Sequence, residues 1–585
     1  MKIRCARMLV LALLILATLA AAGSVVESQP AAFELIIRNG RVIDGAGNPF
    51  VLADVAVQDG RIVVVGQVPD DAGAARTIDA RGLYVVPGFI DMHSHGGPAH
   101  ANGLRSEHNS LMQGITTAVL NPDGGGMWPI AEHVARYRRE PVGVNVVMMV
   151  GHNRIREMAM GMDQRPADAA ELERMKQLLR QGLDEGAYGM TLGLEGTPGR
   201  WSDTAELIGL ATVIAEYGGF FHTHQRAEGR SPRWWNASRP GVPVDGLEAT
   251  RESIVVSERS GARVMATHFK ILGKDFWGAS DAALRLIDEA RARGAQMYLD
   301  TYTYESYGNT ANVALVPTWA LVDDEVDVGG QDSGLAGRLD APYSASLDQL
   351  RRRLEDPVER YVVRRDIAYE IRKAGGPEGV LVIEHPTAEY RGRTLEEIAA
   401  LHGEDPVDAA IRLQLEGDPS RPGGGAYRGM NISEIDNEAI IQKPYLTYGT
   451  DGGVVPFGEG YPHPRYYGIY PRIIRQYVFD RHVISLPFAI RAMTSLAAQI
   501  IGLPERGLLR EGYRADITVF DPVTIRPNST YLAPHVYPTG IRYVVVNGHV
   551  AVDAGTLTDA LAGMMLAPPW TGGARPAPAN GAQPH

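Results

Sequence analysis

The sequence predicts an α/β protein whose main body is a distorted (β/α)8 TIM barrel, and three observations lead to this prediction. Short apolar runs typical of buried strands alternate with helical stretches throughout residues 86–499. Several of these runs end in a histidine or an aspartate, and barrels collect their catalytic groups at strand ends. Asn-Gly and Asp-Gly pairs near both ends of the chain predict short hairpins outside the barrel.

The strands of the predicted barrel correspond to apolar runs that each stop where a loop pattern begins. The last residue of each run is therefore expected at the carboxyl end of a strand. The runs end near His95, Asn121, His152, Glu195, His224, His268, Tyr302 and Asp451. Because parallel barrel strands end on one face, we expect side chains at these positions to converge.

Residues 33–85 and 500–560 predict a small β-sandwich that the two ends of the chain build together. Asn39–Gly40 and Asp59–Gly60 separate alternating apolar stretches in the first segment, and Asn547–Gly548 does so in the second. Such pairs favour the tight turns of β-hairpins.

The connection between the last two barrel strands, residues 306–442, is too long for a single crossover helix. We expect an insertion with helices at Leu347–Glu355 and Val362–Ala374. Its position at the catalytic face suits a lid, and a subdomain without a gating role is the alternative. After Gly555 the chain is rich in proline and glycine, and residues 567–585 are expected to form a disordered tail.

Residues 1–22 have the pattern of a secretory signal peptide. Basic residues precede an apolar run from Met8 to Leu19, and alanines follow at the expected cleavage site. Cleavage would remove Cys5, the only cysteine of the chain, which suits an oxidising compartment. We therefore expect an exported protein, periplasmic or secreted, with no membrane attachment after cleavage; an uncleaved hydrophobic anchor is the alternative.

The composition is that of a globular protein, with 45% hydrophobic and 22% charged residues in a chain of 585. A formal net charge of −12 and a pI near 5.8 argue against a nucleic acid partner. We expect a small-molecule partner, and the sequence leaves the oligomeric state open.

His93 and His95 stand two residues apart at the end of an apolar run, so on a strand both imidazoles point to the same side. Neutral histidine is the commonest metal ligand in proteins. His224, His268 and Asp451 end three other runs in the same way. Histidines and an aspartate that meet at one barrel face predict a two-metal hydrolytic centre.

Motifs along nearly all of the chain after the expected signal peptide resemble those of the amidohydrolase superfamily, and within it the N-acyl-D-amino-acid deacylases. The His-x-His pair and the aspartate after the last strand resemble the superfamily as a whole. The segments around Arg226, His268–Lys270 and His463–Arg465 resemble the deacylase branch. The matching stretches are Pro87–His95, Gly114–Val119, Gly151–Asn153, Gly193–Gly199, Thr223–Gly229, Thr267–Lys270, Asp300–Tyr304, Gly449–Gly452 and His463–Gly468.

The resemblance implies a zinc centre with one or two ions per subunit. His93, His95 and Asp451 are expected to hold one ion, and His224 with His268 the other. The resemblance also implies that Asp451 acts as general base towards water and then as general acid towards the leaving amine.

Two acidic residues are candidates for the ligand between the metals. Glu195 stands where many relatives have a carboxylated lysine, and Asp123 where the deacylases often have a cysteine. We expect Glu195 to be the principal bridge, because a strand end holds a ligand more firmly than the glycine-rich loop of Asp123 does. Asp123 is expected near the metals but second in importance. The alternatives are a turn residue for Asp123 and a buried salt bridge for Glu195.

A substrate with a free carboxylate needs a cationic partner in the site. Arg465 and Lys270 are the candidates, and Tyr302 or Tyr304 is expected to donate a further hydrogen bond. His152 either contacts the substrate or is a core histidine with its hydrogen bonds satisfied.

The activity that the resemblance implies is hydrolysis of the amide bond of N-acyl-D-amino acids, with release of a carboxylate and a D-amino acid. A D-dipeptidase or a cyclic-amide hydrolase on the same barrel is the alternative. A non-catalytic exported binding protein is a more distant alternative, which the set of ligand-type residues argues against.

Overall fold

The computed structural model describes residues 33–308, 313–321 and 347–571. The expected signal peptide, residues 1–22, lies outside these ranges. Within them, no helix is both long and apolar enough to cross a membrane.

The barrel strands form two sheets in which all neighbours are parallel. One sheet has the order β6-β7-β8, and the other has the order β9-β10-β11-β12-β13-β16. Only Met149 separates β8 from β9, and a hydrogen bond from Met92 N to Tyr448 O (3.2 Å) connects the first strand to the last. The strands are β6 (Phe89–Asp91), β7 (Ile115–Leu120), β8 (Asn145–Met148), β9 (Val150–Gly151), β10 (Gly189–Gly193), β11 (Phe220–His224), β12 (Arg263–Ala266), β13 (Met297–Thr301) and β16 (Leu446–Tyr448).

These strands are nearly continuous apolar runs because helices and loops cover them on both sides. Every residue of β7, β8, β10 and β11 is buried. Strands that are buried on both faces lose the polar alternation of half-exposed strands. The strand and helix order confirms the predicted α/β barrel class.

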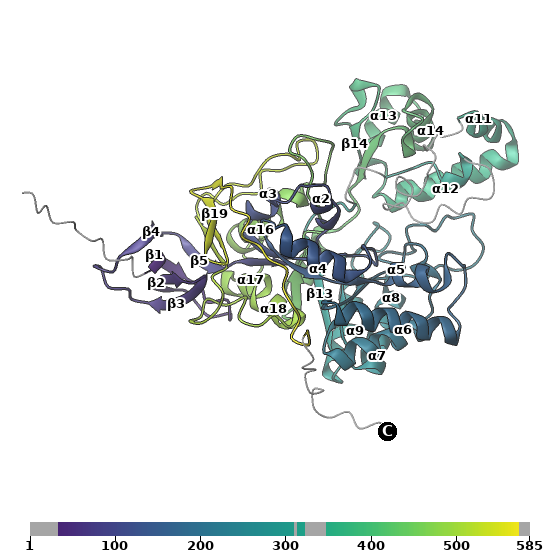
Figure 1. The fold of residues 1–585 in the computed structure, drawn as a ribbon. Helices are drawn as coiled ribbons and strands as arrows, with labels where there is room; N and C mark the ends of the chain where they lie inside the picture. The colour runs from purple at the N-terminus through teal and green to yellow at the C-terminus, as the bar shows by residue number, and fades with distance from the viewer. Residues whose placement is uncertain (1–32, 309–312, 322–346, 572–585) are drawn as a thin grey trace, which may run out of the picture.

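Helices surround the barrel sheets on their outer side (Figure 1). Acidic caps define where two of them begin: Asp168 and Asp245 each form a reciprocal capping box with a glutamate three residues later. The helices are α2 (Gly97–Ala101), α3 (His108–Leu111), α4 (Ile130–Arg139), α5 (His152–Met160), α6 (Ala169–Asp184), α7 (Thr204–Tyr217), α8 (Gly246–Ser260), α9 (Ser280–Ala292), α15 (Glu434–Ile441), α16 (Arg465–Arg472), α17 (Leu486–Met493) and α18 (Ser495–Ile501).

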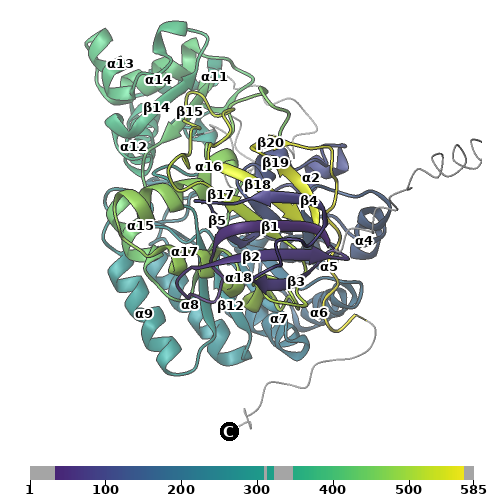
Figure 2. The same cartoon turned by 90° about the vertical axis from the view of Figure 1, so that its left-hand side faces the viewer.

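The two ends of the chain meet in a second β-structure, as expected (Figure 2). Hydrogen bonds join its strands in one nine-stranded sheet with the path β20-β19-β18-β17-β5-β1-β2-β3, and β4 pairs with β1. The C-terminal β17 is antiparallel to β5, which leads directly into the barrel. The strands are β1 (Phe33–Val42), β2 (Val51–Gln58), β3 (Arg61–Gly66), β4 (Ala74–Asp79), β5 (Tyr84–Pro87), β17 (Ile517–Phe520), β18 (Ile541–Val546), β19 (His549–Asp553) and β20 (Thr556–Leu557).

The segment between β13 and β16 forms a separate lobe, which we call the insertion lobe (residues 313–321 and 347–429; Figure 1, upper right). It has its own hydrophobic core, which includes Leu350, Ile367 and Val382. The last helix of the expected insertion, α15, packs against barrel helix α9 instead. The lobe contains α11 (Leu347–Glu355), α12 (Pro357–Lys373), β14 (Val380–Glu384), α13 (Leu395–His402), α14 (Pro406–Glu416) and β15 (Ala426–Gly429).

The start of the expected disordered tail is ordered, because Trp570 is buried against the barrel. Its ring packs edge-on against Tyr188 and Tyr217, and its indole N–H donates to Leu183 O (3.2 Å). A buried indole removes a large apolar area from water, which offsets the ordering of a proline-rich segment. The prediction of disorder is therefore wrong for residues 567–571, and residues 572–585 lie outside the described part of the chain.

Candidate active site

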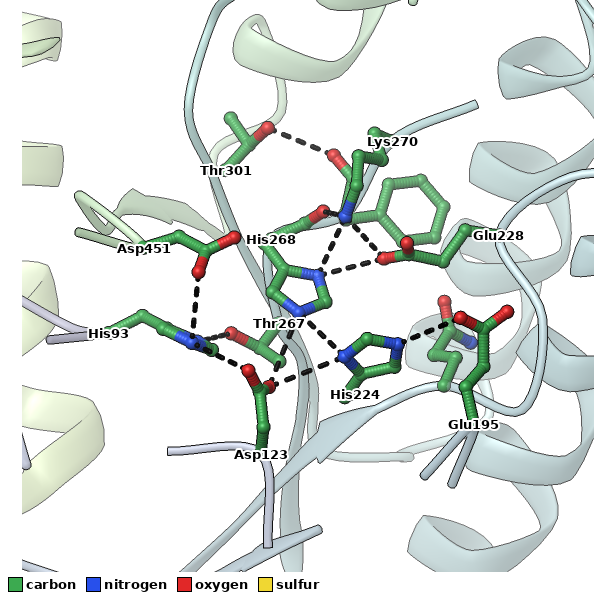
Figure 3. Close-up of polar contacts among 12 residues, drawn as sticks. His93, Asp123, Glu195, His224, Glu228, Thr267, His268, Lys270, Thr301 and Asp451 are labelled. Atoms are coloured by element: carbon green, nitrogen blue, oxygen red, sulfur yellow. Dashed lines mark hydrogen bonds and ion pairs between the residues drawn. The ribbon is translucent and has the colours of Figure 1, made fainter. Parts of the chain in front are cut away.

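Side chains of metal-ligand type converge at the carboxyl ends of the barrel strands (Figure 3). Most of them are buried, whereas His95 and Asp123 are half-buried. They are His93 and His95 after β6, Asp123 on the loop after β7, His224 at the end of β11, His268 after β12 and Asp451 after β16.

The first donor group consists of His93, His95, Asp123 and Asp451. The Nε2 atoms of His93 and His95 are 3.3 Å apart, and Asp451 Oδ1 lies 3.2 Å from His95 Nε2. Asp123 Oδ2 lies 3.4 Å from both of these nitrogens. Ligands at about 2.1 Å from a tetrahedral ion are about 3.4 Å from one another, so the spacing fits an ion such as zinc.

The second donor group consists of Asp123, His224 and His268. Asp123 Oδ1 lies 3.4 Å from His224 Nδ1 and 3.3 Å from His268 Nε2, and the two nitrogens are 3.0 Å apart. Three protein donors with this spacing are typical of catalytic zinc sites, which keep a further position for water or substrate.

Asp123 lies between the two groups, because its carboxylate gives one oxygen to each. Glu195 does not: its Oε2 lies 3.3 Å from His224 Nε2, which is not the ring nitrogen that Asp123 approaches. The structure therefore contradicts the expectation that Glu195 is the principal bridge. The reason is the path of the loop after β7, where Asn121 and Asp123 adopt left-handed backbone conformations (φ 63° and 53°) and the Asp123 carboxylate reaches the histidines.

The histidines of the second group each have a carboxylate on the side of the ring that faces away from Asp123 (Figure 3). Glu195 lies behind His224, and Glu228 Oε1 lies 2.8 Å from His268 Nδ1. Lys270 donates to the same oxygen of Glu228. Such carboxylates fix the tautomer and the orientation of a ligand histidine.

Other buried groups hold the remaining ligands in place. Thr267 Oγ1 lies 2.6 Å from His93 Nδ1. Asp300 accepts a hydrogen bond from the backbone N–H of His268 (2.8 Å) and lies 2.9 Å from His222 Nε2. His222 is therefore occupied by Asp300 and does not join either donor group around Asp123.

Three of the ligand-type residues have backbone conformations that non-glycine residues rarely adopt. The φ angles are 53° at Asp123, 34° at His268 and 45° at Asp451. Such strain costs of the order of 1–3 kcal/mol at each residue and is common at functional sites. The surrounding barrel therefore fixes these ligands at the expense of local stability.

The electrostatics of the site favour a bound cation. Burial opposes ionisation of Asp123, but the charge of His93 and hydrogen bonds from His224 and His268 hold its pKa well below the usual value. Burial also opposes protonation of His95 and His224, yet contacts with Asp123 and its acidic neighbours raise the pKa of each to about 9. Protons on these imidazoles thus supply positive charge that a metal would replace, because metal ligands must be deprotonated.

Three of the expected substrate-binding residues lie together beside Asp451. Arg465 Nη2 is 3.0 Å from Asp451 Oδ2, and its guanidinium lies over the Tyr302 ring at 4.3 Å. Lys270 Nζ is 5.5 Å from the centre of the same ring. Arg226, by contrast, pairs with Glu252 on both carboxylate oxygens and orients its loop.

Two of the candidate substrate-binding residues are engaged elsewhere, which favours the core alternative for His152 and leaves Tyr302 as the candidate tyrosine. His152 is fully buried, with Nε2 2.8 Å from Glu206 Oε1, so it is a core histidine with its hydrogen bonds satisfied. Tyr304 packs against Arg472, 4.5 Å from the ring centre, and its hydroxyl donates to Pro464 O (3.5 Å).

Several functional-site residues were not expected from the sequence. Glu228 and Arg233 belong to the long loop after β11, where strand periodicity gives no orientation. Thr267 precedes a candidate ligand and has no polar signature of its own. Asp300 carried a usable signal, because a carboxylate within an otherwise apolar strand must have a partner.

A family model described as "Amidohydrolase family" matches residues 76–313 and 353–552. An N-acyl-D-glutamate deacylase of Alcaligenes xylosoxydans xylosoxydans is 31% identical over 539 residues, which cover 88% of this chain and 93% of that protein. A D-aminoacylase of the same organism is 29% identical, over 92% of this chain and 98% of the relative.

A solved structure is similar over almost the same length. It is an N-acyl-D-glutamate deacylase from Bordetella bronchiseptica, complexed with zinc and a phosphonate inhibitor that mimics the tetrahedral intermediate. It aligns with a TM-score of 0.69 at 28% identity, over 92% of this chain and 99% of the other.

Proposed function

Because the chain belongs to the amidohydrolase family, we propose that it hydrolyses the amide bond of N-acyl-D-amino acids, with one or two zinc ions at the two donor groups. The observation that carries the proposal is the position of Asp123, which faces both groups at 3.3–3.4 Å. The D configuration and the acyl amide are supported by the deacylases to which the chain is similar over most of its length.

Asp451 is the residue that moves protons in this proposal. When bound, zinc acidifies water and polarises an amide carbonyl. Burial opposes ionisation of Asp451, but Arg465 and His93 hold its pKa well below the usual value, so it is ionised and able to accept a proton from water. The same carboxyl group then protonates the amine, which leaves poorly as an anion.

The free carboxylate of the substrate is placed beside Arg465, Lys270 and Tyr302. Arg465 offers a planar set of donors, of which one nitrogen is 3.0 Å from Asp451. Lys270 donates to Glu228 and to His268 O, and its Nζ also lies 2.9 Å from His268 Nδ1. With His268 Nε2 as the ligand atom, Nδ1 carries the proton and donates to Glu228, so one ammonium proton of Lys270 is left for a substrate.

The test is a substrate screen with the purified full chain supplied with zinc. N-acetyl-D- and N-acetyl-L-amino acids are compared with D- and L-dipeptides and with cyclic amides, and Asp451→Asn is the control for contaminating amidases. We expect release of free D-amino acid from the N-acetyl-D compounds. Turnover restricted to dipeptides or cyclic amides would replace this proposal with the alternative of the same superfamily, and zinc-free inactive protein would favour a binding protein.

Export to the periplasm or the medium is a second part of the proposal. It is supported by the basic start, the apolar run and the alanines of residues 1–22. Expression of the full chain in a bacterial host, followed by fractionation and N-terminal sequencing, tests it. A chain that keeps Met1 and stays with the membrane fraction would favour the uncleaved anchor.

A further inference from the structure

Arg233 is a buried cation beside the second donor group that the proposed reaction does not use. Its Nε donates to Glu195 Oε2, and its backbone N–H donates to Glu195 Oε1 (3.1 Å). The side chain is 10% exposed. Arg233 therefore bonds both carboxylate oxygens of Glu195, one through its backbone N–H and the other through its side chain.

Glu195 in turn determines how His224 presents its ligand atom. A neutral imidazole has one N–H and one lone pair. With Nδ1 turned towards Asp123 and His268, Nε2 carries the proton and donates to Glu195, 3.3 Å away. Arg233 Nη2 also lies 3.0 Å from the same His224 Nε2. Arg233 thus acts on the metal site as a positioning residue, through Glu195 and through its own contact with His224.

The loop that carries Arg233 (residues 225–245) is held by helix α12 of the insertion lobe. Lys373 Nζ donates to Arg233 O (2.7 Å) and to Trp235 O (3.1 Å). Tyr369 shares a hydrogen bond with Ser231 (2.7 Å between the hydroxyl oxygens).

A further contact lies on the same face of α12. Asp366 accepts a hydrogen bond from the backbone N–H of Ser238 (2.8 Å). The positions 366, 369 and 373 are spaced i, i+3 and i+7, which places them on one face of the helix. One face of α12 is thus bonded to the loop at several points.

We propose that helix α12 sets how tightly the second donor group holds zinc, through the loop 225–245, Arg233 and Glu195. The inference rests on the proposed zinc centre and deepens it. Every link is a direct contact: Lys373 to the Arg233 carbonyl, Arg233 to Glu195, and Glu195 to His224. Partners behind a metal ligand typically change metal affinity about 10–100-fold when they are removed. The insertion lobe then contributes to the metal site through the contacts of α12 with the loop.

The experiment measures zinc affinity of the full chain by competition with a chromogenic chelator, without substrate. The test variant is Lys373→Met, which keeps the aliphatic stem but removes the bonds to the loop. The matched control is Lys274→Met, because Lys274 bonds Glu378 of the same lobe but not the loop. We expect one zinc equivalent to bind about 10-fold more weakly in Lys373→Met, because α12 reaches Glu195 only through Arg233. In Lys274→Met both zinc equivalents should bind as tightly as in the wild type.

Arg233→Lys and Arg233→Gln extend the series at the site itself. The lysine keeps a cation beside Glu195 but loses the guanidinium, so we expect an intermediate affinity, and a larger loss in Arg233→Gln. Equal zinc affinities in wild type, Lys373→Met and Arg233→Lys would overturn the proposal, whether or not Arg233→Gln folds. A weakened zinc equivalent in a chain without deacylase activity would support the inference and refute the proposed function. A wild-type chain that binds no zinc would overturn both.

Discussion

The two donor groups share Asp123 but differ in what surrounds their other ligands. In the second group both histidine side chains are almost fully buried, at 5% and 3% exposure, and each has a carboxylate and a cation behind it. In the first group His95 is 27% exposed, and Asp451 is paired with Arg465. In the proposed mechanism, the second group therefore holds an ion in a fixed place, and the first group contacts the substrate and exchanges protons with it.

The cations behind the second group explain why two buried carboxylates are tolerated there. Glu195 is balanced by Arg233, and Glu228 by Lys270. Removing one partner of a buried ion pair destabilises the protein, because it leaves an uncompensated buried charge. We thus expect the two groups to respond differently when single residues are changed.

The largest effect is expected from Asp123→Asn, which removes the negative charge that both groups share and replaces one of the two donor oxygens with an NH2 group. We expect the zinc content to fall. The value of kcat/KM should decrease by more than ~10²–10⁴-fold, which is the contribution of a general base alone. Metal analysis and steady-state assays measure this, with Glu195→Gln as the comparison, which should keep at least one ion. If Glu195→Gln lost more zinc than Asp123→Asn, Glu195 would be the shared ligand after all.

Asp451→Asn separates chemistry from metal binding. We expect kcat to fall about 10²–10⁴-fold, because the amide cannot accept a proton from water. The zinc ion of the second group should remain, since none of its donors changes. Loss of all zinc from this variant would mean that the two groups are not independent.

Glu228→Gln tests whether the carboxylate beside His268 strengthens zinc binding at the second donor group. Zinc there should bind about 10–100-fold more weakly, because His268 loses the carboxylate that orients it. The ion of the first group should be unaffected, and chelator competition resolves the two. If both zinc ions bound more weakly by the same factor, Glu228 would not act on the second donor group alone.

The smallest effect is expected from Thr267→Val, which removes the hydroxyl 2.6 Å from His93 Nδ1. Zinc at the first group should bind about 10-fold more weakly, at the low end for such partners. Thr301→Val is the control, because that hydroxyl donates to Phe269 O (2.9 Å) and touches no ligand. A similar loss in both variants would indicate a general packing defect.

The barrel class and its strand ends are predictable from the sequence because apolar runs and their polar ends have a fixed period. His93, His95, His224 and His268 stand on or directly after strands, so period two and barrel geometry suffice to bring them together. Asp123 was underrated for the opposite reason. Its loop has left-handed residues whose path no hydrophobic pattern encodes.

Charge pairing was the second source of error. Lys270 was expected to face the substrate, yet its ammonium also neutralises Glu228, a residue of a long loop. Arg233 lies on the same loop and has no local signal at all. Contacts made by loops depend on tertiary packing, which single-sequence periodicity does not carry.

The burial of Trp570 has a consequence for the order in which this chain folds. The segment before it pairs with β8, where Val146 N donates to Met564 O (2.9 Å) and Leu566 N donates to Val146 O (2.9 Å). A strand near the start of the barrel is thus completed by residues that follow the last barrel strand in the sequence. Because such distant contacts form slowly, we expect the native barrel to assemble only after residue 570 has left the ribosome.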